Sequence, residues 1–337
     1  MIIVLKPGVS KKEETAVLRE IRKLGYTPHV MRGVARTVVG AIGDERTHAN
    51  LESLSTWPQV ESVTPIQKRY KLVSREAHPT DSTVTARGVV IGGKTFQVMA
   101  GPCSVESEDQ LLRTAVAVKE SGATILRGGA FKPRTSPYEF QGLGEKGLKL
   151  LAKARRETGL PVVTELLSEN HADLVAEYAD ILQIGTRNAQ NFQLLIAAAK
   201  TGKPVLLKRG MSMRIEEWLL AGEYILANNN PGLLFCERGV RTFENYTRNL
   251  LDLSVIPILK SETHLPVVID PSQGTGKAAL VTAMCKGAVA MGADALIIEV
   301  HPNPAEAWSD GAQQVTLDGF KRLMTELRPF ITAAGRN

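Results

Sequence analysis

The sequence predicts an α/β fold, namely a (β/α)8 TIM barrel preceded by a small βαββαβ domain. From about residue 84 onward, short apolar segments alternate with amphipathic segments, and eight such pairs follow one another. Eight βα units in about 250 residues match the size and rhythm of a barrel. The apolar segments are nearly continuous, as in parallel strands that are buried on both faces. Residues 1 to about 72 follow a different order of elements, which indicates a separate domain.

The N-terminal domain begins with an apolar strand, MIIVLK, and an amphipathic helix follows it. Ser10 can cap that helix, and Glu13, three positions later, completes a capping box. Gly25 is expected to end the helix. The apolar face of the helix is predicted to consist of Ala16, Val17, Leu18, Ile21 and Leu24.

The rest of this domain completes a βαββαβ order. TPHVMRG and ARTVVGAIGD are interpreted as a hairpin pair, and a short helix near 46–55 leads to a last strand, VESVTPIQ. This order in about 70 residues is the ferredoxin-like split βαβ pattern. We therefore expect a ferredoxin-like domain over 1–73. The stretch 74–83, SREAHPTDST, is polar, contains proline and lacks periodicity, so it is predicted to be a linker to a barrel over 84–337.

A short hairpin, GVVIGGKTF, is expected before the barrel. The eight barrel strands are predicted in QVMAGPCS, ATILRGGA, PVVTELL, DILQIGT, PVLLKRG, LLFCERG, PVVIDPS and ALIIEV. Helices are predicted at 106–121, 145–158, 191–200, 278–291 and 316–332. A doubly wound open sheet is the alternative fold, but it usually has a Gly-rich first turn, which AGPCSVES does not provide.

Composition narrows the classes of protein to which this chain can belong. Hydrophobic residues make up 43% of the chain and charged residues 23%, as in ordinary globular proteins. No apolar run reaches the ~18 residues of a membrane span and the N-terminus does not resemble a signal peptide, so we expect a cytoplasmic protein without a membrane partner. The net charge of +6 is spread along the chain, which disfavours nucleic-acid binding. Cys103, Cys236 and Cys285 are too sparse for a disulfide framework.

Cationic side chains follow several of the predicted strands. In a barrel, function lies at the C-terminal ends of the strands. Cations gathered there repel one another unless an anion belongs among them, and the planar fork of arginine suits carboxylate and phosphate groups. The sequence therefore predicts a site for one or two phosphorylated or carboxylated small molecules. The residues expected to line it are Arg127, Lys132, Arg134, Arg187, Lys208 and Arg238.

A second set of residues at the strand ends indicates a metal site. Cys103 follows the first predicted barrel strand, Glu299 belongs to the eighth, and Asp310 lies in the loop after it. The first and eighth strands are neighbours in a closed barrel. A thiolate with carboxylates suits a borderline divalent ion. The alternative is that Cys103 is only a small buried apolar residue.

The stretch IDPSQGTGK contains a glycine–lysine pair that raises the question of a nucleotide-binding loop. That motif needs a glycine, four residues, and then Gly-Lys-Ser/Thr. The required first glycine falls on Pro271, and Ala278 stands where the hydroxyl residue belongs. The motif is therefore absent. GTGK is interpreted as a tight loop that leads into the next helix, whose N-terminal amides can assist an anion.

Nine stretches occur in an order that is typical of one family. They are AGPCSVES, LRGGAFKPRTSPYEFQG, TEL, IGTRNAQN, LLKRG, CERGVRTFE, IDPS, IIEVHPNP and SDGAQQ. With these stretches the chain resembles the type Iβ 3-deoxy-D-arabino-heptulosonate 7-phosphate (DAHP) synthases from end to end of the barrel, and its N-terminal domain resembles the regulatory domain that some members carry. The resemblance implies a transferase that condenses phosphoenolpyruvate with erythrose 4-phosphate, the first step of the shikimate pathway and of aromatic amino-acid biosynthesis.

The resemblance also implies roles for individual residues. The phosphoenolpyruvate site would consist of Arg127, Lys132, Arg187, Lys208 and Arg238. Lys132 would also protonate the aldehyde oxygen, and Glu165 resembles the carboxylate near the water that adds to C2. Asp270 would contact the hydroxyls of the sugar. The contacts for erythrose 4-phosphate would otherwise come from Lys132, Pro133, Arg134, Thr135 and Ser136.

Gln273 departs from the pattern of that family. The family's metal site has Cys, His, Glu and Asp, and the His directly follows DPS, where this chain has Gln273. An amide oxygen is a weaker partner than imidazole for a borderline transition metal. Three interpretations remain open: Gln273 ligates the ion through its oxygen, it holds a water that does so, or the site binds metal poorly.

We expect real but weakened binding of one divalent ion of the Mn, Fe, Co or Zn class. The ligand positions implied by the resemblance are Cys103, Gln273, Glu299 and Asp310. His301 is not expected to replace the missing ligand, because EVHPNP is interpreted as a turn away from the eighth strand.

Two other functions remain as alternatives. The sister enzyme 3-deoxy-D-manno-octulosonate 8-phosphate synthase takes arabinose 5-phosphate, but it is expected to have an ANRSS-like run in place of KPRTS and no N-terminal domain. A weakly active phosphometabolite-binding regulatory variant is the second alternative, because of Gln273. The resemblance further implies a homotetramer and an aromatic amino-acid effector, Tyr or Phe, at the N-terminal domain. A domain that only supports oligomerisation is the alternative to that effector site.

Overall fold

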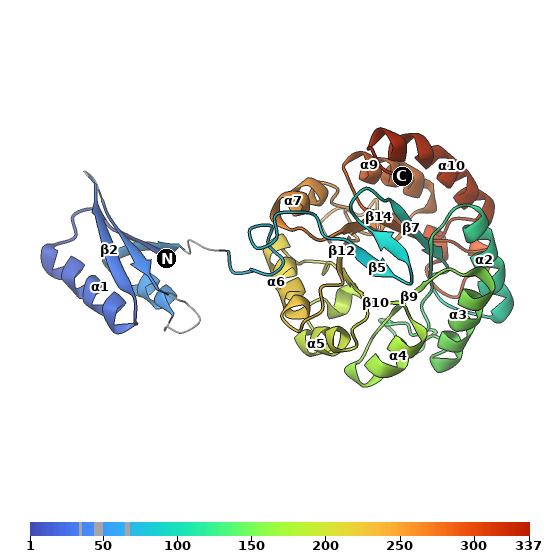
Figure 1. Ribbon diagram of the computed structural model, residues 1–337, viewed down its shortest axis with the longest axis horizontal. Coiled ribbons are helices and arrows are strands. Elements are labelled where there is room, and N and C mark those ends of the chain that lie inside the picture. Colours follow the sequence, from blue (N-terminus) through green and yellow to red (C-terminus); the bar gives the residue numbers. More distant parts are fainter. Residues whose placement is uncertain (34–35, 44–49, 65–67) are drawn as a thin grey trace. The chain divides into compact units, whose positions relative to one another are not determined.

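The structure, a computed structural model, describes residues 1–33, 36–43, 50–64 and 68–337. It divides into two compact units, Met1–Arg69 and Tyr70–Asn337 (Figure 1). The sequence places this boundary after residue 73. Each unit has its own buried apolar core, so each is described by itself.

The first unit is built on a four-stranded antiparallel sheet with the order β2-β3-β1-β4. Its strands are β1 (Ile2–Leu5), β2 (Thr27–Arg32), β3 (Thr37–Ile42) and β4 (Val60–Thr64). Helix α1 (Lys11–Lys23) connects β1 to β2, and the 3-10 helix η1 (Leu51–Thr56) precedes β4. This topology is the split βαβ pattern, so the ferredoxin-like prediction is confirmed.

Helix α1 begins as the sequence predicts. The Ser10 hydroxyl accepts from the backbone N–H of Glu13 at 3.3 Å, and the Glu13 carboxylate accepts from the backbone N–H of Ser10 at 2.9 Å. Val17 and Ile21 are buried, but Ala16 is exposed. Each helical residue is turned by about 100° from its neighbour, so Ala16 points away from the buried stripe, and its expected place on the apolar face was wrong.

The second helix of this unit differs from the expectation. Of the stretch near 46–55, residues 51–55 belong to the 3-10 helix η1, and 46–49 lie outside the described residues. Leu51 and Leu54 are fully buried in the core of the unit. Residues three apart stack above each other in a 3-10 helix, so this short element presents both leucines to the sheet.

The second unit contains a closed barrel of eight parallel strands, as the sequence predicts. The strands are β7 (Gln97–Gly101), β8 (Ile125–Arg127), β9 (Val162–Glu165), β10 (Ile181–Ile184), β11 (Val205–Lys208), β12 (Leu233–Glu237), β13 (Val267–Ile269) and β14 (Ala295–Glu299). Strand β14 pairs with β7 over five positions, which closes the barrel and excludes an open sheet. Every residue of these strands except Gln97 is buried, which explains their continuous apolar sequences.

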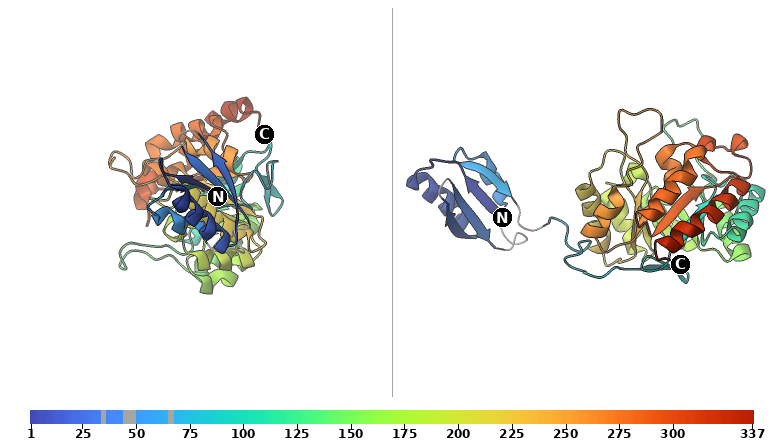
Figure 2. Two further views of the ribbon diagram at one scale, coloured as in Figure 1. Left: turned by 90° about the vertical axis from the view of Figure 1, so that its left-hand side faces the viewer. Right: turned by 90° about the horizontal axis from the view of Figure 1, so that it is seen from above.

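Helices surround the barrel (Figures 1 and 2). The helices are α2 (Glu108–Glu120), α3 (Glu145–Thr158), α4 (Ala172–Tyr178), α5 (Phe192–Lys200), α6 (Ile215–Leu226), α7 (Val255–Glu262), α8 (Pro271–Thr275), α9 (Ala278–Ala290) and α10 (Leu317–Ala333). Short 3-10 helices are η2 (Glu169–His171), η3 (Thr186–Asn188), η4 (Pro304–Glu306) and η5 (Gly311–Gln313). The five helices predicted from the sequence agree with these bounds to within two residues.

The stretch after β13 is a helix and not the tight loop that the sequence suggested. Pro271–Thr275 form α8, which Asp270 caps, and Gly276 ends it with a left-handed φ of 69°. Proline at the first position of a helix costs no hydrogen bond and has a suitable φ. This local chemistry favours one helical turn before α9.

A hairpin precedes the barrel, but it lies earlier than expected. Its strands are β5 (Val84–Ala86) and β6 (Val89–Ile91), joined at Arg87 and Gly88 with φ of 46° and 86°. Two positive φ values in a two-residue turn match the twist of a hairpin. Val84, Ala86 and Ile91 pack with inward-facing residues of all eight barrel strands, so the hairpin covers the barrel interior.

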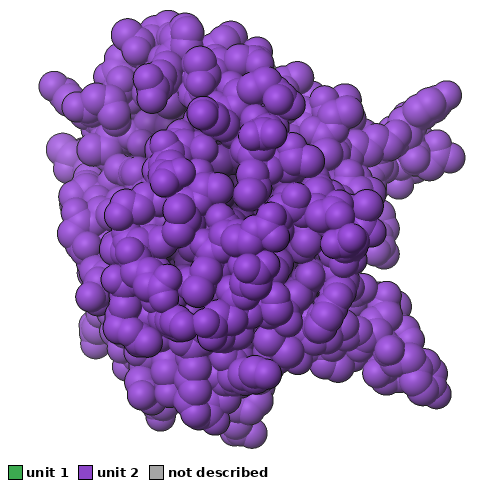
Figure 3. Space-filling model, turned by 90° about the vertical axis from the view of Figure 1, so that its right-hand side faces the viewer, with its two compact units in different colours: residues 1–69 green, residues 70–337 purple. Residues whose placement is uncertain are grey.

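The polar segment 74–83 lies in the second unit. The backbone N–H of Arg75 donates to Glu262 O at 3.0 Å, and its guanidinium pairs with Asp81 at 2.7 Å. The segments after β8 and after β12 extend from the barrel in both views of Figure 2. Figure 3 shows the second unit from another side, with two segments projecting from its body. Among the described residues, no helix has the length and apolar character needed to cross a membrane.

Candidate active site

A cavity of about 320 Å³ lies at the C-terminal ends of the barrel strands. Its cationic side chains are Arg127, Lys132, Arg134, Arg187, Lys208, Arg238, Arg241 and Arg248. All six cations that the sequence singled out therefore line one cavity. Its carboxylates are fewer, namely Glu139, Glu165 and Asp310. The excess of positive charge in a partly closed space favours an anionic ligand.

Two arginines in the wall of this cavity have buried donors without a protein partner. Arg127 ends β8 and Arg238 directly follows β12, and their exposed fractions are 5% and 6%. Within the described part of the chain, Arg127 Nε and Arg238 Nη1 have no hydrogen-bond partner. A buried donor without an acceptor is costly. An anion bound among these guanidinium groups would supply the missing acceptors.

Lys132 is held in the wall by Cys103. Its Nζ donates to Cys103 O at 3.1 Å and to Cys103 Sγ at 3.0 Å. Gly129 leaves room for it, because a Cβ there would lie 2.8 Å from Lys132 Cδ. Burial by itself would lower the pKa of Lys132, but the Cys103 sulfur, Glu299 and Glu165 favour the ammonium and raise that pKa. Lys132 is therefore charged at neutral pH and can donate a proton or a hydrogen bond.

Glu165, the last residue of β9, is a buried carboxylate of the cavity. Gly185 follows β10 and lies directly against it, since a Cβ on Gly185 would lie 1.9 Å from Glu165 Oε1. Burial raises the pKa of Glu165, although the charges of Lys132 and Lys208 oppose this rise. A carboxylate with a raised pKa is suited to accept a proton near neutral pH.

Asp270 is buried behind the cavity wall. Its Oδ2 accepts from Lys208 Nζ at 2.5 Å, and its Oδ1 accepts from the backbone N–H of Gln273 at 2.9 Å. It is 1% exposed and is not among the described residues that line the cavity. Asp270 thus fixes Lys208 and begins α8, and its expected contact with the sugar hydroxyls stays a prediction.

The segment after β8 contributes four of the residues expected to bind the sugar phosphate, and Lys132, described above, is the first of them. Pro133, Arg134 and Thr135 line the cavity, whereas Ser136 is not part of the described lining. Arg134 forms two hydrogen bonds to Glu139, at 2.9 and 3.2 Å. The guanidinium is thus held by a carboxylate of its own loop.

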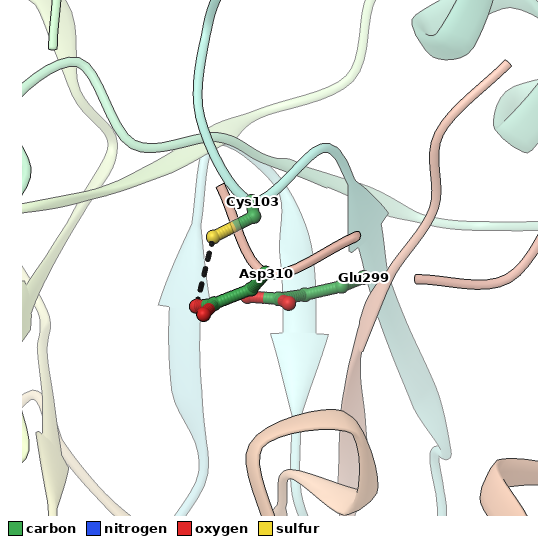
Figure 4. Close-up of side chains that lie close together, drawn as sticks. All are labelled: Cys103, Glu299 and Asp310. Carbon is green, nitrogen blue, oxygen red and sulfur yellow. Dashed lines mark hydrogen bonds between the residues drawn. The ribbon is translucent and has the colours of Figure 1, made fainter. Parts of the chain in front are cut away.

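Cys103, Glu299 and Asp310 come together as the sequence predicts (Figure 4). One potential ligand atom from each lies within 4.8 Å of the others. Cys103 Sγ donates to Asp310 Oδ2 at 3.4 Å. The pairing of β14 with β7 places Glu299 opposite Gly101, two residues before Cys103. Closure of the barrel therefore builds this cluster from the first and the last strand of the barrel.

The residues present fit a divalent cation with three protein ligands. A thiol and two carboxylates at these separations can all reach one ion at about 2.0–2.3 Å. Burial and the charge of Glu299 raise the pKa of Cys103 to about 12, so metal binding would displace its proton. Burial would raise the pKa of Asp310, but Arg248, Lys132 and the hydrogen bond from Gln273 lower it to about 2. Asp310 is therefore ionised and ready to bind a cation.

Gln273 faces the same cluster with its nitrogen. Its Nε2 donates to Glu299 Oε1 at 3.0 Å and to Asp310 Oδ2 at 3.2 Å, and its Oε1 accepts from Arg238 Nη2 at 3.0 Å. A guanidinium only donates and an ionised carboxylate only accepts, so this orientation of the amide is determined by its neighbours. In this orientation the nitrogen of Gln273, and not its oxygen, faces Glu299 and Asp310.

Two other residues near these motifs are outside the cluster. His301 Nε2 lies 3.2 Å from Glu106 Oε2, and its Nδ1 accepts from the backbone N–H of Asn303 at 3.0 Å. Both ring nitrogens are therefore engaged away from the metal ligands. Lys277 of the GTGK stretch precedes α9 and is not part of the described cavity lining.

Several residues of the site were not predicted from the sequence. Arg241 and Arg248 lie in the segment after β12 and line the cavity. Arg248 Nη1 donates to Asp310 Oδ1 at 3.1 Å and to Gln313 Oε1 at 3.0 Å. The run RGVRTFENYTRN places three arginines in one loop after a strand, which was the signal for them. Gln183, Thr186, Met211 and Asn249 also line the cavity.

Comparisons with known proteins agree with this architecture. Residues 72–333 match the DAHP synthetase I family, and residues 1–68 match the DAHP synthase ferredoxin-like domain. A phospho-2-dehydro-3-deoxyheptonate aldolase of Thermotoga maritima is 48% identical over 335 residues, which are 99% of each chain. A 2-dehydro-3-deoxyphosphooctonate aldolase of Caulobacter vibrioides is 33% identical over 276 residues, covering 76% of this chain and 95% of that protein.

Two solved structures from Thermotoga maritima extend the comparison. A crystal structure of phospho-2-dehydro-3-deoxyheptonate aldolase (DAHP synthase) has a TM-score of 0.95 at 48% identity and covers 100% of this chain and 98% of that one. A truncated form of 3-deoxy-D-arabino-heptulosonate 7-phosphate synthase has a TM-score of 0.75 at 49% identity, covering 80% of this chain and 98% of that one. The family match spans most of the barrel unit and the likeness extends over the full length, so the chain belongs to the DAHP synthetase I family.

Proposed function

We propose that this protein is a DAHP synthase, which condenses phosphoenolpyruvate with D-erythrose 4-phosphate and water to give DAHP and phosphate. The observation that carries the proposal is one cavity in which eight cationic side chains surround a buried carboxylate, Glu165, and adjoin a possible metal cluster. The relative that is 48% identical over its full length is named for this activity.

The cationic wall suits two phosphorylated substrates. Phosphoenolpyruvate carries a phosphate and a carboxylate, and the buried donors of Arg127 and Arg238 have room for such an acceptor. Binding both anions in one cationic cavity would overcome their mutual repulsion and hold the reacting carbons close together, which can contribute several kcal/mol to catalysis. The residues proposed for phosphoenolpyruvate are Arg127, Lys132, Arg187, Lys208 and Arg238. Those proposed for the sugar phosphate are Lys132, Pro133, Arg134, Thr135 and Ser136.

The reaction assigns proton transfers to two buried groups. C3 of phosphoenolpyruvate attacks the aldehyde carbon, a C–C bond forms, and the aldehyde oxygen takes a proton from Lys132. Positive charge develops at C2, water adds there, and Glu165 accepts the proton of that water. The C2–O bond to phosphate then breaks, its electron pair leaves with the phosphate, and the C2 hydroxyl gives its proton to the departing phosphate as the ketone forms. The raised pKa of Glu165 suits its role as a base near neutral pH.

A divalent ion of the Mn, Fe, Co or Zn class is proposed at Cys103, Glu299 and Asp310. When bound, it would supply Lewis-acid stabilisation of negative charge on a substrate oxygen. The chain's own contribution there is to hold the two carboxylates in place, Glu299 through Arg127 at 3.1 Å and Asp310 through Arg248 at 3.1 Å.

An assay of phosphate release tests the proposal. We expect turnover with phosphoenolpyruvate and erythrose 4-phosphate in the presence of Mn²⁺, and at least tenfold lower kcat/KM with arabinose 5-phosphate. Lys132→Met should abolish turnover, whereas Lys286→Met, which removes a surface pair with Glu326 and a contact with the Phe330 ring, should not. A higher kcat/KM with arabinose 5-phosphate would indicate the sister enzyme. Binding of phosphoenolpyruvate without turnover would indicate the regulatory variant.

We further propose that residues 1–69 form a regulatory unit that binds an aromatic amino acid, Tyr or Phe, in a homotetramer. The match of residues 1–68 to the DAHP synthase ferredoxin-like domain supports this proposal. Removal of residues 1–69 should abolish inhibition by Tyr or Phe and keep turnover. Inhibition that survives the removal would contradict the proposal. Light scattering of both proteins would show whether the unit instead serves assembly.

A further inference from the structure

The side chain of Gln273 connects the anion cavity to the metal cluster. On one side its Oε1 accepts from Arg238 Nη2 at 3.0 Å. On the other side its Nε2 donates to Glu299 Oε1 at 3.0 Å and to Asp310 Oδ2 at 3.2 Å. The two amide hydrogens thus link two carboxylates that are also potential metal ligands. No other described side chain donates to both carboxylates by the hydrogen bonds of this structure.

This orientation opposes metal binding. A cation bound by Glu299 and Asp310 would lie beside the positively polarised hydrogens of Nε2 and would have to break both of their hydrogen bonds. Turning the amide of Gln273 by half a turn would present Oε1 to the cation. The turned nitrogen would then face Arg238, which has no acceptor to offer, so the turn is unfavourable while Arg238 depends on Gln273.

An anion at Arg238 changes this balance. Arg238 Nη1 is buried and has no hydrogen-bond partner in the described protein. A phosphate group that accepts from Arg238 would replace Oε1 of Gln273 as its acceptor. It would also accept from Nε2 of the turned amide. The turned state is therefore favourable only when an anion is bound at Arg238 and a cation is bound at the carboxylates.

We propose that Gln273 is a positioning residue that couples the binding of a phosphate group at Arg238 to the binding of a divalent cation at Cys103, Glu299 and Asp310. The inference rests on the proposed function, in which this cavity holds a phosphorylated substrate beside a metal ion. Reciprocity follows from linkage: each ligand raises the affinity of the protein for the other by the same factor.

Calorimetry of the full chain without turnover tests the coupling. Mn²⁺ is titrated into the protein with and without inorganic phosphate, with correction for the Mn²⁺–phosphate complex in solution. We expect phosphate to tighten Mn²⁺ binding at least tenfold. Titration with Co²⁺, followed by the thiolate-to-metal absorption of Cys103, gives a second readout that reports ligation directly.

Direct attraction between the two ions also produces some coupling, so variants must separate the two causes. Gln273→Ala removes the amide and leaves every charge in place, so its remaining coupling measures direct attraction alone. We expect it to bind Mn²⁺ more tightly than the wild type without phosphate, and to show a coupling factor about tenfold smaller. Gln273→Glu accepts from Arg238 and offers an oxygen to the cation at once, so it should bind Mn²⁺ without phosphate and show no more coupling than Gln273→Ala.

Equal coupling factors in the wild type and Gln273→Ala would overturn the inference, as would failure of the wild type to bind Mn²⁺ even with phosphate. These results are distinguishable from failure of the proposed function. If the wild-type protein turns over the substrates but lacks the coupling, the proposed function is supported and the inference about Gln273 is contradicted. If the wild-type protein shows the coupling but does not turn over the substrates, the coupling is supported and the proposed reaction is contradicted.

Discussion

Lys208 Nζ lies 2.5 Å from Asp270 Oδ2, and the side chains of this ion pair are only 5% and 2% exposed. Lys208 ends β11 and faces the cavity, while Asp270 follows β13 and caps α8. One carboxylate therefore fixes a cationic wall residue and begins the helix that carries Gln273. The pair is placed where barrel strands end, so its loss would affect stability and the cavity together.

Asp270→Asn should destabilise the barrel by about 3–5 kcal/mol, because the substitution removes the ion-pair partner of the buried Lys208. Asparagine still offers an oxygen that can cap α8, so the loss of stability measures the effect of removing the carboxylate charge. Denaturant unfolding of the full chain measures the effect. The control is Asp252→Asn, which removes a half-buried partner of Arg209 while Glu237 remains with it at 3.0 Å. Equal losses in the two variants would contradict the prediction.

Gly185→Ala should lower turnover roughly 100-fold, because displacement of a catalytic group by about 1 Å has an effect of that size. The φ of Gly185 is −70°, so alanine is allowed by the backbone and only the contact with Glu165 changes. A Cβ there would lie 1.9 Å from Glu165 Oε1. Gly40→Ala is the control, since its Cβ would meet nothing closer than 3.7 Å. Unchanged turnover in Gly185→Ala would show that the position of Glu165 is not critical.

Glu165→Gln should abolish most turnover and yet raise the melting temperature at pH 7. Burial raises the folded-state pKa of Glu165 above its ordinary value, so ionisation of this group destabilises the fold at pH values above the ordinary carboxyl range. Glutamine removes that cost. The gain in melting temperature should shrink as the pH falls through the folded-state pKa of Glu165. It should vanish below about pH 4, where Glu165 is protonated in both the folded and the unfolded protein. Thermal melts from pH 4 to pH 8 measure it, and a gain that is independent of pH would contradict this account.

The three cysteines should not react with a thiol reagent in the native protein. Cys103, Cys236 and Cys285 are buried, and burial raises the pKa of each thiol, that of Cys103 to about 12. The thiolate is the reactive form, so labelling should be slow at pH 7. Three thiols should react after unfolding in denaturant. Fast labelling of Cys103 in the native protein would show that its sulfur is more exposed or more acidic than the structure indicates.

The fold could be predicted because its signals are local. Continuous apolar strands at regular spacing, the Ser10–Glu13 capping box and the glycines that end helices are each visible in a short stretch, and the structure confirms the barrel and the ferredoxin-like unit. The family expected from the motifs is also confirmed. The prediction was wrong where two possible turns lie close together in the sequence. At the hairpin, the Arg87–Gly88 turn and not the Gly92–Gly93 pair joins β5 to β6.

The candidate site was predictable as a set of residues but not as a set of contacts. Six cationic residues were predicted at the strand ends, and closure of the barrel brings all of them to one cavity. Their partners come from elsewhere in the chain: Lys208 is paired with Asp270, and Arg248 reaches Asp310 over 62 positions. Such pairings depend on how loops cross the barrel mouth, which no local pattern records.

The sequence alone determined the alternation of strands and helices, the chemical types at the strand ends and the substitution of glutamine at position 273, because each of these is a property of neighbouring residues. Only the tertiary structure decided that Asp270 lies behind the wall, that Gly185 makes space for Glu165, and that the amide of Gln273 turns its nitrogen to the carboxylates. The physical reason is that orientation and burial are set by groups that are distant in sequence and become neighbours when the barrel closes.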